Sequence, residues 1–347
     1  MRYQLTAIES PCPVCGEAQG RLLYQRTAEQ AAQHFVLREK EPARHERLVA
    51  AIRRLWQGNE VALVECAGCG FVHAEPHVGG DMEFYTLAYD RTHYPRDKWE
   101  FTQSVQAITA DPRLREIGLE NLRVLEVGAG EGNFLRQLIA AGLRPENLAA
   151  TDFSEYGRQQ IASLGVRVFG KDVRELTPAD LPGPAHVICL FQVLEHLDDA
   201  VGLFARFAEL GTAGVVVLAG VPAPRRMAFN ETNGSLLDMP PNHIGRWTPR
   251  ALEKLAERTG WRLDAVAIEP EGAGAKLSQF AKFGYLRAMQ DSGSLANRVE
   301  RMSGGGAQTL ARAGLAAAYT ARRLPAALKL ASDGTLGNVM WMRLSRG

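Results

Sequence analysis

The 347-residue sequence contains no apolar run long enough to cross a bilayer. Its basic start is not followed by an apolar stretch, so we expect no signal peptide. An excess of charge of one sign is missing too. The net charge is +1 at pH 7, and acidic and basic residues are interspersed, so no global field favours nucleic acid or acidic surfaces. We therefore expect a cytoplasmic protein without a membrane span and without a nucleic-acid partner.

Cysteine is scarce, and four of the five cysteines form two pairs, Cys12/Cys15 and Cys66/Cys69. In a reducing compartment such pairs favour metal binding over disulfides. A glycine follows the second cysteine of each pair and lets the chain turn beneath a metal ion. Four thiolates leave no coordination position open for water, so the pattern predicts a structural Zn²⁺ held by Cys12, Cys15, Cys66 and Cys69. Cys189 lies in an apolar run and is expected in the core.

The cysteine pairs enclose a polar stretch, Thr27 to Trp56, in which apolar residues recur at near-helical spacing. We expect residues 1–80 to form a zinc-ribbon-like module with a helical insertion. Zinc ribbons also bind nucleic acid or protein, but no basic cluster with interleaved aromatic residues surrounds these cysteines. The module is therefore expected to support the substrate-binding region or to contact a second subunit, and a homodimer stays open.

Residues 81–118 are rich in aromatic side chains, among them Tyr85, Tyr89 and Tyr94. Their spacing is typical of a helix. We expect a helical connector, whose tyrosines either fold over the site as a lid or pack in the core.

From residue 119 to the end, short apolar runs alternate with helical patterns, which indicates an α/β fold with a doubly wound parallel sheet. Residues 275–331, rich in Ala, Leu and Arg, predict a helical insertion before the last strand; it packs on the core, pairs subunits or touches a membrane. Ser154, Asp198 and Thr248 are expected helix N-caps. The predicted strands are Leu122–Val127, Leu148–Thr151, Val166–Phe169, His186–Phe191, Val215–Ala219, Trp261–Glu269 and Val339–Leu344.

The first predicted strand leads into a glycine-rich turn that carries Gly128, Gly130 and Gly132. A dinucleotide fingerprint would have its third glycine at position 133, where this chain has asparagine, and a P-loop would need a lysine. Phosphates would also sit poorly beside Glu126 and Glu131. The turn instead suits a phosphate-free ligand with an ammonium and a sulfonium, which nearby carboxylates attract. S-adenosylmethionine has this chemistry.

Leu125 to Gly132 resembles the first motif of class I S-adenosylmethionine-dependent methyltransferases, and the resemblance continues over about two-thirds of the chain. It implies a seven-stranded Rossmann-like sheet whose last strand is antiparallel. It also implies that Asp152 holds the ribose hydroxyls, Asp172 the adenine amino group and Gln192 the methionine end. The cofactor-binding set that it implies is Glu126, Gly128, Ala129, Gly130, Gly132, Asp152, Phe153, Asp172, Val173 and Gln192.

Methyl transfer to an OH or CH acceptor needs a group that removes a proton, and histidine suits that task near neutral pH. The catalytic candidates are His196, after the fourth predicted strand, and His243, in the loop 238–247. This loop resembles the histidine-bearing loop of methyltransferases with an N-terminal zinc module, including those that C-methylate nucleotide-linked deoxysugars. Several of those have histidine or glutamate before the histidine, whereas this chain has Asn242.

Arg225, Arg226 and Asn230 lie upstream of that loop and are expected either to bind a substrate phosphate or carboxylate or to be solvated. The sequence thus predicts a zinc-containing methyltransferase for a small molecule, a sugar or natural-product intermediate methylated at carbon or oxygen. The alternatives are an RNA or protein methyltransferase and a non-catalytic adaptor that keeps the fold.

Overall fold

The computed structural model describes residues 6–38, 40–89, 95–232, 238–289, 291, 293–302 and 304–347. Its larger sheet has seven strands in the order β11-β12-β9-β8-β5-β6-β7. The five strands from β9 to β7 pair in parallel, and β12 runs antiparallel to both of its neighbours, as the resemblance implied. The strands are β5 (Val124–Val127), β6 (Leu148–Thr151), β7 (Arg167–Phe169), β8 (Ala185–Phe191), β9 (Gly211–Pro222), β11 (Arg262–Ile268) and β12 (Val339–Ser345).

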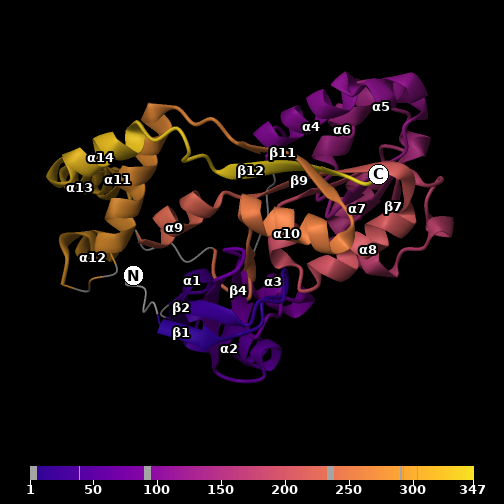
Figure 1. Ribbon diagram of the computed structural model, residues 1–347. Coiled ribbons are helices and arrows are strands. Elements are labelled where there is room, and N and C mark those ends of the chain that lie inside the picture. Colours follow the sequence, from indigo (N-terminus) through magenta and orange to yellow (C-terminus); the bar gives the residue numbers. More distant parts are fainter. Residues whose placement is uncertain are drawn as a thin grey trace.

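Helices cover both faces of this sheet (Figure 1). Successive side chains of β5 point to opposite faces and are buried on both. Val124 packs into one apolar cluster with Phe134, and Leu125 packs into another with Phe204. The sheet is therefore doubly wound, as predicted. The helices of the first cluster include α4 (Trp99–Ala110), α5 (Pro112–Ile117), α6 (Asn133–Ala140) and α7 (Glu155–Ala162), and those of the second are α8 (Ala200–Leu210) and α10 (Pro249–Thr259).

Most helix boundaries lie where the capping residues predict them. Ser154 caps α7 and Thr248 caps α10, each with its side-chain oxygen on a backbone N–H. The predicted cap Asp198 was wrong, because Asp199 accepts from Gly202 N–H to cap α8. The carboxylate of Asp198 instead pairs with Arg174, at 2.8 Å.

A second, antiparallel sheet contains the N-terminal strands in the order β1-β2-β3-β4-β10. Its last strand, β10, comes from about 170 residues later in the chain, since Gly245 pairs with His73 and Arg246 with Val72. The insertion between the cysteine pairs is two helices, because Pro42 opens the second one. The elements are β1 (Thr6–Glu9), β2 (Gln19–Thr27), β3 (Glu60–Cys66), β4 (Val72–Glu75), β10 (Gly245–Arg246), α1 (Ala28–Phe35) and α2 (Pro42–Trp56).

The remaining helices connect the two sheets or form a lobe before β12 (Figure 1). α3 (Met82–Ala88) follows the N-terminal sheet, and α9 (Pro224–Thr232) follows β9. The lobe comprises α11 (Ala273–Met289), α12 (Leu295–Glu300), α13 (Gly306–Arg322) and α14 (Leu324–Ala331). Short 3₁₀ turns are η1 (Leu119–Asn121), η2 (Pro145–Asn147), η3 (Val173–Glu175), η4 (Pro178–Asp180) and η5 (Leu194–His196). Within the described parts of the chain, no helix is long and apolar enough to span a membrane.

Candidate functional site

The glycine turn between β5 and α6 adopts a backbone that side chains disfavour. Gly128, Gly130 and Gly132 have φ of 68°, 56° and 75°. A Cβ on Gly128 would lie 2.5 Å from a methyl group of Val193. The N–H groups of Gly128 and Ala129 donate to the carbonyl of Thr151, at 2.9 and 3.0 Å, and so tie the turn to the end of β6.

Asp152 follows β6 and contacts this turn directly. Its Oδ2 accepts from Gly130 N–H at 2.7 Å, and its Oδ1 accepts from Ser154 N–H at 2.8 Å. Burial outweighs these bonds and raises the pKa of the carboxyl. Each carboxylate oxygen has a second lone pair, so Asp152 still has capacity for ligand hydroxyls.

Glu126, the third residue of β5, has a buried carboxyl oxygen without a hydrogen-bond partner among the described residues. The residue is 2% exposed, and its Oε2 has no hydrogen-bond partner among the described residues. Burial raises the pKa of this carboxyl well above its ordinary value. A cationic ligand group beside the turn would stabilise the ionised, buried carboxylate. Glu126 therefore fits the ammonium of S-adenosylmethionine.

The other predicted cofactor residues lie after the carboxyl ends of neighbouring strands. The Phe153 ring is 61% exposed beside Asp152 and can pack against a ligand. Gln192 follows β8 with φ of 60°, rare for a residue other than glycine. Val173 is buried. The Asp172 carboxylate is already engaged by the Arg174 guanidinium, at 3.0 and 2.8 Å, a pairing that the sequence did not reveal.

Beside the end of β8, η5 presents His196 to residues from two distant segments. The Nδ1–H of His196 donates to the carbonyl of Asn242, and Oη of Tyr85 lies 2.9 Å from the same nitrogen. Because a carbonyl only accepts, Nε2 carries the lone pair of this ring. Burial, followed by the charge of His243, lowers the pKa of His196 to about 3, so the ring is neutral.

His243 lies against His196, with ring centroids 4.8 Å apart. Its Nδ1 is 3.0 Å from Oδ1 of Asp238, and both side chains are about nine-tenths buried. Burial alone would raise the pKa of Asp238, but the hydrogen bond and charge of His243 lower it. The structure thus brings together both predicted catalytic histidines, with an aspartate oxygen 3.0 Å from Nδ1 of one ring.

Glu195 is a third titratable group here that sequence reasoning missed. It is 1% exposed, and neither carboxylate oxygen has a partner in the described part of the chain. Burial raises its pKa to about 7. One ligand-capable atom from each of Glu195, His196 and His243 lies within 4.8 Å of the others. In the sequence, the feature that could have pointed to Glu195 was its position next to His196.

The comparisons with known proteins decide the identity of this fold. Residues 99–266 match the methyltransferase domain family, and this range holds the glycine turn and both histidines. The chain contains a class I S-adenosylmethionine-dependent methyltransferase domain. No curated protein matches the sequence.

The methyltransferase domain is also similar to solved structures at low identity. Magnesium protoporphyrin IX methyltransferase from Synechocystis PCC 6803, with bound SAH, has a TM-score of 0.41 and 12% identity over 76% of this chain and 92% of its own. An S-adenosylmethionine-dependent methyltransferase from Mesorhizobium loti has a TM-score of 0.42 and 14% identity over 73% and 100%. The cyclopropane synthase MmaA2 from Mycobacterium tuberculosis has a TM-score of 0.38 and 14% identity over 75% and 90%.

The four paired cysteines cluster outside the methyltransferase sheet. Sγ of Cys12 is 3.7 Å from that of Cys69, and Sγ of Cys15 is 3.5 Å from that of Cys66. Zn–S bonds of about 2.3 Å place tetrahedral sulfurs roughly 3.8 Å apart, so these thiols fit zinc. Gly16 and Gly70 turn beneath them with φ of 79° and 71°. Cys189 is buried in β8, as expected.

The cysteine module touches the methyltransferase domain near the histidine loop. Thr248 Oγ1 donates to the carbonyl of Cys69 at 3.1 Å, and the Trp247 ring packs on Phe71 at 4.6 Å between centroids.

Deeper in this contact, a buried triad joins β2, α9 and β10. Tyr24 Oη donates to Glu231 Oε1 at 2.6 Å, and Arg246 donates to Glu231 Oε2 at 2.9 Å and to Tyr24 Oη at 2.8 Å. Because β10 begins two residues after His243, the module fixes the end of the loop that holds this histidine.

Two predicted substrate-binding residues are engaged elsewhere. Arg226 is buried and ion-paired with Glu271, and Arg225 pairs with Asp333 at 2.7 Å. Arg226 is therefore not solvated, whereas the Arg225 side chain remains 60% exposed beside Asp333, as the solvated alternative expected. Asn230 hydrogen-bonds to Asp238, and Tyr94 lies outside the described residues.

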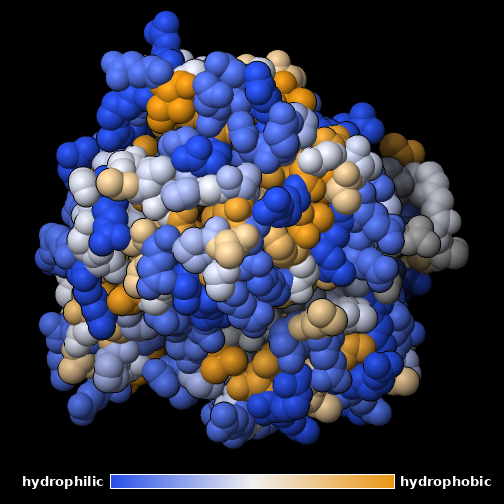
Figure 2. All heavy atoms as spheres, turned by 90° about the vertical axis from the view of Figure 1, so that its right-hand side faces the viewer, coloured by the Kyte–Doolittle hydropathy of each residue, from blue (hydrophilic) through white to orange (hydrophobic). Residues whose placement is uncertain are grey.

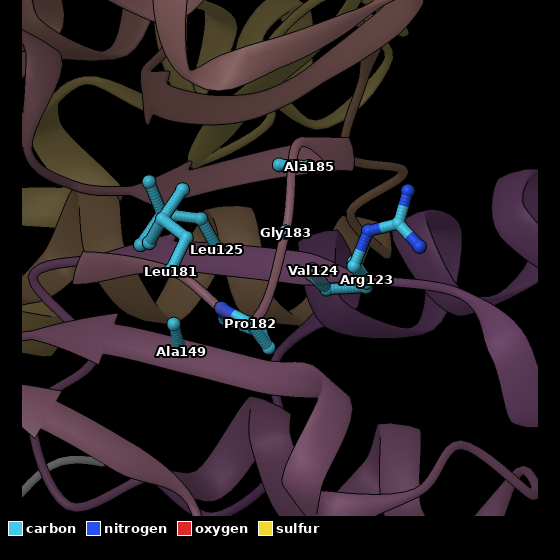
Figure 3. A pocket seen from close by; sticks show the side chains of 8 residues that line it. All are labelled: Arg123, Val124, Leu125, Ala149, Leu181, Pro182, Gly183 and Ala185. Atoms are coloured by element: carbon cyan, nitrogen blue, oxygen red, sulfur yellow. The ribbon is translucent and has the colours of Figure 1, made fainter. Parts of the chain in front are cut away.

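A hollow lies at the opposite edge of the methyltransferase sheet (Figure 3). Its side chains come from the amino ends of β5 and β6 and from the segment that leads into β8: Arg123, Val124, Leu125, Ala149, Leu181, Pro182, Gly183 and Ala185. Ligands of open α/β sheets bind at the carboxyl ends of the strands, so this hollow is not the cofactor site.

Proposed function

We propose that this methyltransferase acts on a small molecule, a sugar or natural-product intermediate, at carbon or oxygen. The supporting observation is the convergence of two groups of residues at one edge of the sheet. The glycine turn follows β5, and η5 with His196 follows the adjacent strand β8. His243 and Asn242 are 8% and 2% exposed, and so enclosed a site favours a small acceptor over a macromolecule.

The proposed cofactor residues are those around the glycine turn. Glu126 binds the cofactor ammonium, and Asp152 accepts hydrogen bonds from the ribose hydroxyls. At Ala129 and the turn glycines the cofactor lies close to the protein backbone. Phe153, Asp172 and Val173 surround the adenine, and Gln192 borders the methionine end. When bound, S-adenosylmethionine supplies a methyl group on a sulfonium, which is already activated for displacement.

The proposed catalytic residue is His243. The Asp238 carboxylate, 3.0 Å from Nδ1, favours the tautomer with the proton on that nitrogen, so Nε2 has the lone pair that takes a proton from the acceptor. His196 is neutral and, with Tyr85, orients the acceptor beside the cofactor. The carboxyl group of Glu195 lies next to these rings. Once His243 has accepted a proton, the ionised form of Glu195 stabilises its positive charge.

We further propose that Cys12, Cys15, Cys66 and Cys69 bind a structural zinc ion, and that residues 1–80, 81–118 and 119–347 are the zinc module, the connector and the catalytic domain. The proposed role of the module is to support the acceptor loop. The contacts of Thr248, Trp247 and Arg246 with it favour this role over nucleic-acid binding.

The test is transfer of label from methyl-labelled S-adenosylmethionine to three acceptor pools: nucleotide-linked sugars with other small metabolites, RNA, and protein. The proposal predicts label in the small-molecule pool that is lost in His243→Ala. Label in RNA or protein alone would favour the macromolecular alternative. Cofactor binding without transfer to any pool would favour the adaptor.

A further inference from the structure

The helical lobe, residues 273–331, carries a charge that the rest of the chain does not. It contains nine lysines and arginines and two acidic residues, a net charge of +7, although the whole chain has +1. The remainder therefore has a net charge of −6. This asymmetry is hidden in the overall composition.

The lobe also exposes large apolar side chains. Among the described residues, nine large hydrophobic side chains are exposed, and five of them lie in this sixth of the chain. They are Leu295, Met302, Leu310, Leu324 and Leu328, with exposures from 48% to 75%. Single exposed leucines are ordinary on soluble proteins, but a concentration of them marks an interaction surface.

These side chains are not used to build the lobe. Among the described residues of α13 and α14, only Gln308 and Ala327 are buried. On α14, Leu324 and Leu328 are four residues apart and so share one face, next to the exposed Arg322 and Lys329.

The lobe is fixed to the elements around the catalytic site. α9 provides Arg226, which donates to the side chain of Gln279 in α11, and Phe229, whose ring stacks on Phe280 at 6.3 Å. The same helix provides Glu231, a partner of Arg246 beside the histidine loop. In Figure 1 the lobe lies on the left. Figure 2 shows the face turned away from it, which is mostly hydrophilic with scattered apolar patches.

We propose that the lobe docks on an anionic lipid bilayer surface. Leucine side chains enter the boundary between headgroups and acyl chains, while lysines and arginines pair with lipid phosphates. The positive charge of the lobe favours an anionic partner. The exposed leucines favour a bilayer over nucleic acid, because the phosphate backbone of nucleic acid offers no apolar region in which leucine side chains are buried. The lobe lies on the surface, since no described helix is a membrane span.

The test is co-sedimentation of the full chain with vesicles of phosphatidylglycerol mixed with phosphatidylcholine, and of phosphatidylcholine alone. We expect binding to the first, which added salt weakens, and little to the second. L324D/L328D should weaken binding at least tenfold. R322E/K329E should weaken it by about fivefold or more for each basic residue removed. The matched controls L37D and R47E replace exposed residues of the N-terminal half and should bind as wild type.

Thermal unfolding and cofactor binding check that each variant is folded, and the charge variant tests the proposal even if the leucine variant does not fold. Absence of binding to anionic vesicles at low salt would overturn the proposal, as would equal binding to both vesicle types. Tighter binding to an RNA or DNA duplex that survives L324D/L328D would assign the lobe to nucleic acid. A dimer that L324D/L328D dissociates would assign it to a second copy of the chain.

Discussion

His243 is surrounded by residues of its own loop, of η5 and of the N-terminal sheet. Asp238 lies 3.0 Å from its Nδ1, His196 packs edge-on against its ring, and the following residues join the sheet of the cysteine module. An aspartate on Nδ1 leaves Nε2 free to accept a proton. Asn242, the residue before His243, carries no charge, but Glu195 from η5 supplies a carboxyl with an oxygen within 4.8 Å of a ring nitrogen of His243.

For His243→Ala we predict a fall in kcat of about 100-fold or more with an unchanged Kd for S-adenosylmethionine, because proton removal contributes roughly that factor. Turnover is measured at saturating cofactor across pH. His186→Gln, at the opposite edge of the sheet, is the matched control. An undiminished rate for His243→Ala at every pH would remove the base role.

Glu195 makes stability depend on pH. Burial raises its pKa from 4.5 to about 7, so between these values the folded protein keeps a proton that the unfolded chain releases. Stability from this group is therefore lost as the pH rises through that window. Glu195→Gln should gain stability relative to wild type by about 1 kcal/mol per pH unit there. Urea unfolding at several pH values measures this, and since His196 is in both proteins its titration cancels. Parallel curves would contradict the prediction.

Among the elements, the glycine turn and α7 approach each other more closely than side chains allow. A Cβ on Gly157 would lie 2.3 Å from the carbonyl oxygen of Gly130. We predict that Gly157→Ala weakens cofactor binding at least about tenfold, or about 1.4 kcal/mol, by displacing the turn. Gly314→Ala, in α13 with open space around it, should bind cofactor normally and gain about 0.5–1 kcal/mol of stability. Equal cofactor affinity of both variants would show that the turn tolerates the displacement.

The central strands of the larger sheet were predictable because β5, β6 and β8 are short, fully buried runs. β6, for example, spans Leu148–Thr151 as predicted. Strand β10 was not predictable, because two residues carry no period and its partner strand lies near residue 73. The same holds for the site. The histidines and cysteines stand out in sequence, whereas the burial of Glu195 and the ion pair of Arg226 depend on tertiary packing.

At the scale of the whole molecule, the cysteine module and the methyltransferase domain share a sheet, a buried ionic triad and the histidine loop. Metal loss should therefore affect both parts. Cys66→Ser is predicted to lower bound zinc from one ion per chain, to lower Tm by several degrees and to reduce kcat, because the loop loses its support. Metal analysis with calorimetric unfolding tests this, and Cys189→Ser, in β8, controls for the loss of a buried thiol. Two zinc ions per wild-type chain would instead assign Glu195, His196 and His243 to a metal.

The central claim is that the edge of the sheet around Glu126 and the glycine turn binds S-adenosylmethionine. Isothermal titration calorimetry of the full chain tests it most directly. The account predicts one binding site per chain with a Kd below about 1 mM, weakened at least about tenfold in Glu126→Gln, which loses the charge but keeps the size. No heat of binding up to about that concentration, or equal affinity in the Gln variant, would contradict it.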